Sequence, residues 1–175
     1  MPGAIDAAVF LGDGADDLSA ASAQAGFTVP WYKVRGNGDF DFSIPDSLIL
    51  EISGEEPSGE SGLEPFGPGG DSDIPPRKFF LAHGNRHGVE GGGQTIAAAA
   101  RNVGAEAAFF GHTHVPYCAM LNGIFLLNPG SIGRPRSNSG PTFAILECLP
   151  AGRLSVRFFG LAKRGREIIV KELKL

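Results

Sequence analysis

Short apolar runs separated by glycine-rich turns recur along the chain and predict an alternation of strands and helices. Strands are expected at residues 7–11, 28–34, 48–52, 78–82, 107–110, 118–121, 123–127, 142–147 and 153–160. Asp16 and Asp17 could cap a helix that runs to about Ala25, and the alanine-rich segment Gln94–Val103 predicts a second helix that stops at Gly104. The pattern therefore favours an α/β fold.

The order of these elements also predicts how the strands pair. A strand, the second helix and another strand follow one another, which favours a parallel pair. From Tyr117 onward the strands are joined by short turns, so this half is expected to be mostly antiparallel.

The segment 53–76 interrupts the pattern between two expected strands. Its 24 residues include six glycines, five prolines, four serines and six acids, and no Lys or Arg. Such a composition cannot build a core, so we expect a flexible acidic insert on the surface. Without the insert's charge of −6, the rest of the chain would carry +2 instead of the net −4 of the whole chain.

Size and charge exclude several classes of protein. The 175 residues, 42% of them hydrophobic, suit one domain over residues 1–175. The charge gives no sign of nucleic-acid binding, no apolar run reaches the roughly 18 residues of a membrane span, and no signal peptide is evident, which favours a cytoplasmic protein. Cys118 and Cys148 are too few for a disulfide framework and are expected as buried small hydrophobes.

All four histidines lie within 32 positions. His83 and His87 belong to one glycine-flanked loop, and His112 and His114 to another. Each loop follows an apolar strand, so the imidazoles are expected at strand ends, where open α/β sheets place their ligand sites.

Two further strand ends supply oxygen ligands. Asp13 follows Gly12 after the first strand, and Asn37 follows Gly36 after the second. A mixed set of oxygen and nitrogen donors without thiolates suits Mn, Fe or Zn more than Ca or Mg. Carboxylate bridging of two such metals is an arrangement for phosphoester hydrolysis.

The ordered motifs GDGADD, GNGD, HG, GHTH and NPGSIGRPR closely resemble those of the calcineurin-like metallophosphoesterases, and within them the small bacterial YfcE-type phosphodiesterases. The resemblance covers nearly the whole chain outside the insert. It implies a four-layer αββα sandwich of two mixed sheets, in which the family's N-terminal strand and helix are missing.

The resemblance also implies site residues and a cofactor. The residues that match metal ligands are Asp13, Asn37, His83, His112 and His114. Asp13 would bridge two metals, and Asp16 matches an aspartate that supports the site, although it could be only a helix cap. The implied cofactor is a divalent metal, Mn²⁺ with Zn²⁺, Ni²⁺ or Fe as alternatives, with two ions in the family and one or two here.

The sequence departs from the family pattern in two places. No D-x-H motif precedes His83, which removes two ligands of the first metal; a truncation or a genuine loss would explain this and would expose a strand edge. Gly38 stands where many members have a histidine that protonates the leaving group. We hypothesise that His87 takes over this proton transfer; an ordinary loop histidine is the alternative.

The resemblance implies a metal-dependent phosphodiesterase or phosphatase that hydrolyses small phosphoesters through a metal-bound hydroxide. The alternative is a catalytically weak or inactive scaffold or interaction protein on the same fold, which the missing D-x-H favours. The expected partner is a small phosphoester, with no nucleic acid or membrane, and homo-oligomerisation is left open.

Overall fold

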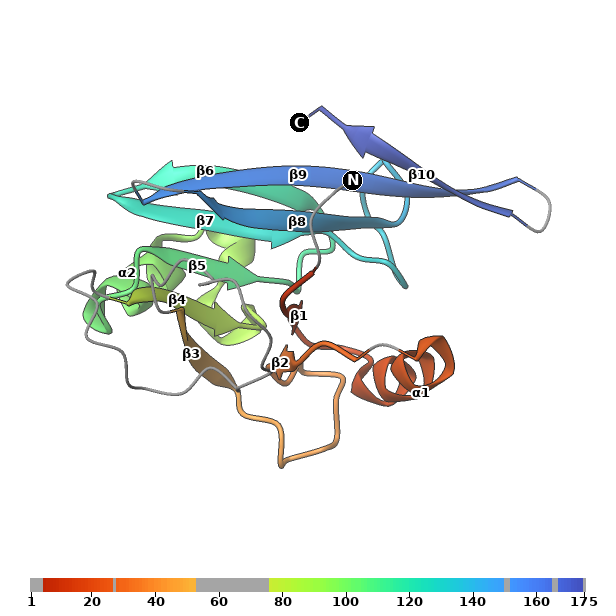
Figure 1. Ribbon diagram of the computed structural model, residues 1–175. Coiled ribbons are helices and arrows are strands. Elements are labelled where there is room, and N and C mark those ends of the chain that lie inside the picture. Colours follow the sequence, from red (N-terminus) through yellow and green to blue (C-terminus); the bar gives the residue numbers. More distant parts are fainter. Residues whose placement is uncertain (1–4, 27, 53–75, 150–151, 165–166, 175) are drawn as a thin grey trace, which may run out of the picture.

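A computed structural model describes residues 5–26, 28–52, 76–149, 152–164 and 167–174. The expected insert, apart from Pro76, lies outside the described residues. Within the described ranges the chain forms the α/β fold that the sequence predicts (Figure 1).

A five-stranded mixed sheet forms the centre of the molecule, in the order β3-β4-β5-β7-β6. Its strands are β3 (Ser47–Ile52), β4 (Arg77–Ala82), β5 (Ala107–Phe110), β6 (Pro116–Leu121) and β7 (Ile124–Pro129). β4, β5 and β7 run parallel, whereas β3 and β6 are antiparallel to their neighbours at the two edges. The parallel pair and the adjacency of the strands on either side of the insert are both confirmed.

Helix α2 (Gln94–Asn102) covers one face of this sheet. Ile96, Ala97 and Ala100 lie on one side of the helix and are buried against alternate residues of β4, β5 and β7, among them Phe80 and Phe110. The small alanines let the helix pack closely on the sheet. This packing fixes the ends of β4 and β5, from which the histidine loops begin.

A second, antiparallel sheet packs on the other face, as Figure 1 shows, in the order β10-β9-β8. Its strands are β8 (Thr142–Leu149), β9 (Arg153–Arg164) and β10 (Glu167–Leu173). Phe158 of β9 is buried with Phe79, Leu81 and Phe109 between the two sheets. β10 was not predicted from the sequence, although Ile168, Ile169 and Val170 form a short β-branched run. In the structure Ile168 and Val170 are exposed.

The N-terminal segment contains β1 (Ala8–Phe10), α1 (Ala15–Ala25) and β2 (Trp31–Lys33), and its two strands form a sheet of their own that packs against the core between the larger sheets. β1 and β2 are parallel, and β1 has no other partner strand within the described ranges, as expected for an exposed strand edge. Most of α1 faces solvent. No described helix covers the outer face of the β8–β10 sheet.

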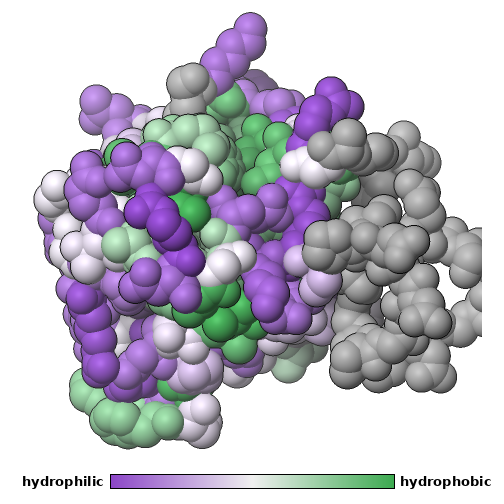
Figure 2. Space-filling model, turned by 90° about the vertical axis from the view of Figure 1, so that its left-hand side faces the viewer, coloured by the Kyte–Doolittle hydropathy of each residue, from purple (hydrophilic) through white to green (hydrophobic). Residues whose placement is uncertain are grey.

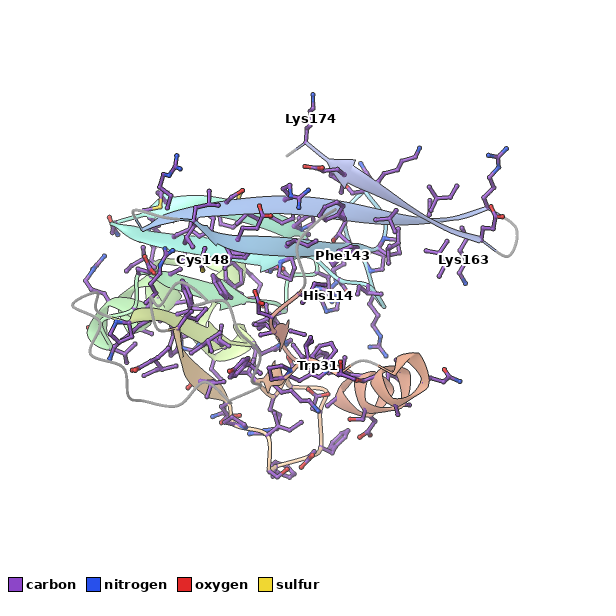
Figure 3. The ribbon with its side chains drawn as sticks, viewed as in Figure 1. Trp31, His114, Phe143, Cys148, Lys163 and Lys174 are labelled. Carbon is purple, nitrogen blue, oxygen red and sulfur yellow. The ribbon has the colours of Figure 1, made fainter. Side chains whose placement is uncertain are left out.

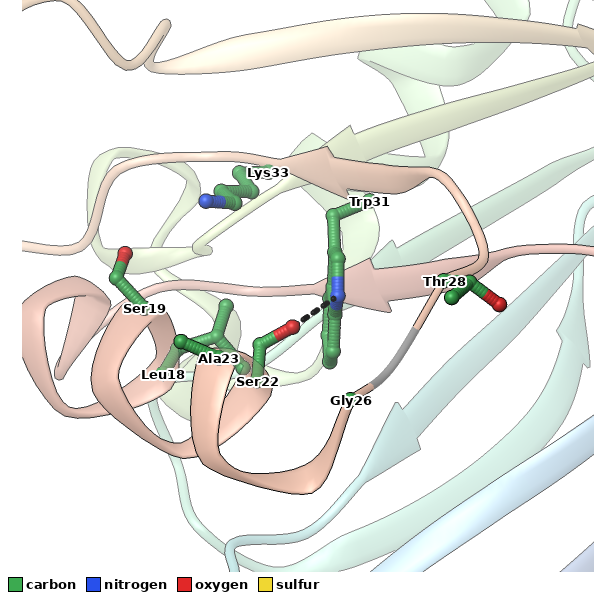
Figure 4. A pocket seen from close by; sticks show the side chains of 8 residues that line it. All are labelled: Leu18, Ser19, Ser22, Ala23, Gly26, Thr28, Trp31 and Lys33. Carbon is green, nitrogen blue, oxygen red and sulfur yellow. Dashed lines mark hydrogen bonds between the residues drawn. The ribbon is translucent and has the colours of Figure 1, made fainter.

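A hollow of about 470 Å³ separates α1 from β2 (Figure 4). Trp31 forms one wall, and its indole Nε1 donates a hydrogen bond to Ser22 Oγ at 3.2 Å across the hollow. None of the site residues expected from the sequence lines it, so size alone does not mark the functional site here.

The expectation that both cysteines are buried is wrong, because Cys118 and Cys148 are exposed free thiols. Cys118 of β6 lies opposite the core residue Leu127, and Cys148 lies near the end of β8 on the same face as Ala144 and Leu146. Both cysteines are on core-facing sides of their strands, at positions that are not covered; Figure 3 labels Cys148. On the face in Figure 2, hydrophobic residues form small patches separated by hydrophilic ones. In the described part of the chain, no helix has the length and apolar character needed to span a membrane.

Candidate functional site

The loop after β1 positions Asp13 through two close backbone contacts. A Cβ at Gly12 would lie 2.6 Å from the backbone nitrogen of Gly36 and from His83 Nδ1, and a Cβ at Gly36 would lie 2.2 Å from Asp13 Oδ1. Only glycine fits at these two positions, so the two strand ends pack directly against each other. Gly38 N–H donates to Asp13 Oδ1 at 2.7 Å.

Asp39 anchors this loop. Its carboxylate accepts backbone hydrogen bonds from Asp13, Gly14, Ala15 and Gly36 at 2.7–2.9 Å, and the residue is only 8% exposed. Burial opposes ionisation, but the four N–H donors outweigh it and hold the pKa of Asp39 below its usual value. Asp39 therefore joins the segment after β1 to the segment after β2.

The same contacts correct the expected helix cap. Gly14 is the N-cap of α1, and no side chain of α1 caps it. Asp16 and Asp17 lie within the first turn, too late in the helix to accept from its first N–H groups, and both are exposed. Asp39 accepts from Gly14 and Ala15 instead, from a distant part of the sequence.

His83 lies at the end of β4 and is only 2% exposed. Its Nδ1–H donates to the carbonyl oxygen of Leu11 at 2.6 Å, which leaves the lone pair of Nε2 for another partner. Nε2 lies 3.4 Å from Asp13 Oδ2 and 3.2 Å from His112 Nδ1. A backbone carbonyl that fixes the tautomer in this way is the usual support of a metal-binding histidine.

The GHTH loop brings the next two histidines to the end of β5. His112 and His114 both have left-handed backbone, with φ of 60° and 59°, and Asp13 shares this conformation with φ of 66°. Residues other than glycine adopt it at a cost, and such strain gathers at functional sites. Asn128 of β7 holds the loop by donating to the carbonyl oxygen of Gly111 at 2.6 Å.

His112 makes two side-chain contacts. One is with His83, and on its other side Nε2 makes a short hydrogen bond with Glu90. His114 is half-buried, and in Figure 3 its label lies between β1 and the β8–β10 sheet. Burial lowers the pKa of His114, and its Nδ1 is buried with no hydrogen-bond partner in the described ranges, so the neutral ring keeps an unused polar atom.

The remaining expected site residues lie at the margin of this cluster. Asn37 is exposed, although both neighbouring glycines contact Asp13. Asp16 makes no hydrogen bond with the cluster in the described ranges. His87 is in the short 3-10 helix Asn85–His87, where its ring packs edge-on against Phe80, and burial lowers its pKa.

The donor types and their spacing fit a divalent cation. Two ligand atoms about 2.1 Å from one tetrahedral ion lie about 3.4 Å apart, which is close to the 3.4 Å and 3.2 Å measured from His83 Nε2 to Asp13 and His112. These contacts are pairwise: among the described residues no three His, Cys, Asp or Glu side chains are arranged around one metal position. The complete ligand set stays a prediction.

Two residues of this site escaped the sequence analysis. Asp39 closes the GNGD motif, and an acid at the end of this glycine-containing motif was the signal for it; its burial is seen only in the folded structure. Glu90 had no local signal, because only the folded loop after β4 brings it to His112.

The sequence model of the calcineurin-like phosphoesterase superfamily domain matches residues 1–149. The chain belongs to this superfamily. It is 30% identical over 139 residues to the probable metallophosphoesterase YsnB of Bacillus subtilis, an alignment that covers 79% of this chain and 68% of YsnB. It is 28% identical over 114 residues to the phosphodiesterase YfcE of Escherichia coli, covering 65% of this chain and 50% of YfcE.

Solved structures agree on the superfamily fold. A single mutant of Vps29 from Entamoeba histolytica superposes with a TM-score of 0.68 at 18% identity, covering 98% of this chain and 83% of that one. Vps29 from Chaetomium thermophilum gives 0.66 at 17% identity, with 98% and 81% covered. At these identities the likeness shows the fold alone.

Proposed function

We propose that the chain is a metal-dependent phosphoesterase that acts on small phosphodiesters at the cluster of Asp13, His83 and His112. The observation that carries the proposal is the contact of a carboxylate and two imidazoles over the ends of β1, β4 and β5. The superfamily is one of phosphoesterases, and the names of YsnB and YfcE are in keeping with this reaction.

Asp13, His83 and His112 would hold the cation, with Asn37 and His114 as further ligands. A divalent ion bound there, Mn²⁺ by our proposal, would supply Lewis-acid stabilisation of the phosphoryl oxygens and lower the pKa of water. Leu11 holds the tautomer of His83, and Asp39 holds the Asp13 loop, so both ligands are oriented before the ion arrives.

Hydrolysis consumes one water, breaks the P–O ester bond and moves one proton of that water to the departing oxygen. We assign the relay of this proton to His87, on the same loop as His83 and beside it in one pocket: its neutral ring would accept a proton at one nitrogen and donate one from the other. Asp16 would act only indirectly, through the first turn of α1.

The test is hydrolysis of bis-p-nitrophenyl phosphate with and without Mn²⁺. We expect Mn²⁺-dependent turnover that falls at least about 100-fold in Asp13→Ala, because a ligand of the cation is lost. Asp17→Ala, which removes an exposed carboxylate from the same segment, is the matched control and should retain activity. Turnover that survives Asp13→Ala would contradict the proposed site.

A scaffold or interaction protein on the same fold is the second candidate. It is favoured by the lack of a three-ligand arrangement in the described part of the chain. A folded chain without turnover at any Mn²⁺ concentration would support this candidate over the enzyme.

A further inference from the structure

A second pocket, of about 240 Å³, adjoins the candidate site and shares His83 with it. Three segments form its walls: Arg35 two residues after β2, Asp46 directly before β3, and the 3-10 helix that holds Arg86 and His87. The backbone N–H of Arg35 donates to the carbonyl oxygen of Pro45 at 2.8 Å, which holds the first two segments together. None of the expected metal ligands except His83 lines this pocket.

The charges in the pocket do not balance. Asp46 pairs with both arginines: one carboxylate oxygen makes a short contact with Arg35, and the other lies 2.7 Å from Arg86 Nη1. Two guanidinium groups therefore share one carboxylate, which leaves one positive charge. The Arg35 side chain is only 16% exposed and stacks on Phe42, with its guanidinium carbon 4.7 Å from the ring centre. A partly buried excess charge of this kind favours an anion.

Unused polar atoms of the lining residues also favour an anion as the ligand. Arg35 Nε and His87 Nδ1 are both buried and have no hydrogen-bond partner in the described ranges. Arginine nitrogens only donate, so an acceptor would satisfy Arg35 Nε once a small movement of the side chain opens this buried atom to the pocket. A phosphoryl or carboxylate oxygen supplies such an acceptor together with the opposite charge.

We propose that this pocket is a subsite for a second anionic group of the substrate, a phosphoryl or carboxylate group, held by Arg35, Arg86 and His87. His83 lines the pocket, and its Nε2 faces Asp13, so a group seated here lies next to the reacting phosphoester. This inference rests on the proposed function and narrows it to phosphoesters that carry a second anion.

The test measures anion binding without turnover. Inorganic phosphate is titrated into the whole chain in EDTA, followed by calorimetry and by the amide shifts of Arg86 and His87. We expect Arg35→Gln and Arg86→Gln to weaken phosphate binding at least about tenfold, since each removes a charged hydrogen bond. Arg86 is 64% exposed in its side chain, so this variant should fold even if Arg35→Gln does not.

Two more variants sharpen the test. Asp46→Asn should strengthen phosphate binding, because it removes the carboxylate that competes for both arginines; a purely structural network predicts no gain. Arg136→Gln removes an exposed arginine of the loop after β7 and should leave phosphate binding unchanged. Absence of phosphate binding, or loss in Arg136→Gln but not in Arg86→Gln, would overturn the subsite. Since EDTA removes the cation, failure of the metal-dependent activity would not affect this result.

Discussion

The two halves of the candidate site differ in how much apolar packing holds them. His83 and His112 follow β4 and β5, whose residues Phe79–Ala82 and Ala107–Phe110 are all buried under α2 and the β8–β10 sheet. Asp13 and Asn37 follow β1 and β2, which have three residues each and only partial burial. The first half is fixed by extensive apolar packing. The second half combines the packing of Val9, Leu11 and Val34 against the core between the sheets with polar contacts to Asp39 and from His83 to Leu11.

This difference predicts how a bound cation would affect the two halves. Both faces of the β4–β5 side are packed, whereas the β1–β2 side packs on the core with a few residues and is otherwise held by hydrogen bonds whose loss is local. Ligands for one cation come from both halves, so the cation itself would join them. Metal binding should therefore stabilise the N-terminal unit more than the central sheet.

The largest expected effect on the free energy of unfolding comes from disrupting the apolar packing of β4 and β5. Phe79 has no exposed surface and stacks on Phe109, with ring centres 5.2 Å apart. Phe79→Ala should lower the free energy of unfolding by about 3–5 kcal/mol, because it leaves a cavity between the sheets. Urea denaturation measures this, with Phe40→Ala as the control, since Phe40 is 85% exposed. Similar stability of the two variants would show that this core does not hold the fold.

A smaller and local effect on stability is expected from removing the hydrogen bonds to Asp39. Asp39→Asn replaces a carboxylate that accepts four backbone N–H bonds, so we expect a loss of about 2–3 kcal/mol. Hydrogen exchange should speed up at Asp13, Gly14 and Ala15 while the amides of β4 and β5 keep their protection. Asp41→Asn, an exposed acid two residues away, is the matched control. Uniform loss of protection over both halves would contradict the division.

The sequence was most informative where burial is strong. The parallel pair β4 and β5, helix α2 and the antiparallel C-terminal strands follow from apolar runs and turn residues, with bounds that differ by one or a few residues. β10 was missed although its run of Ile168, Ile169 and Val170 was visible in the sequence. The cysteines were misassigned because they share strand faces with core residues, and a sequence pattern does not show how far the opposite layer covers those faces.

The chemistry of the site was predicted less completely than its residue types. Histidines and acids at strand ends indicated a cluster, and the contacts of Asp13, His83 and His112 agree with it. The anchoring role of Asp39, the contact of Glu90 and the left-handed backbone of Asp13, His112 and His114 depend on the folded loops, which no local pattern encodes.

The most direct test of a site shared by both halves is Mn²⁺ binding, measured by electron paramagnetic resonance on the whole chain. The account predicts that Mn²⁺ binds and that Asp13→Asn, on the N-terminal half, and His83→Gln, on the central half, each weaken binding at least about tenfold. Asp17→Asn should bind as the wild type does. Binding that survives either ligand substitution, or no Mn²⁺ binding by the folded chain, would contradict the account.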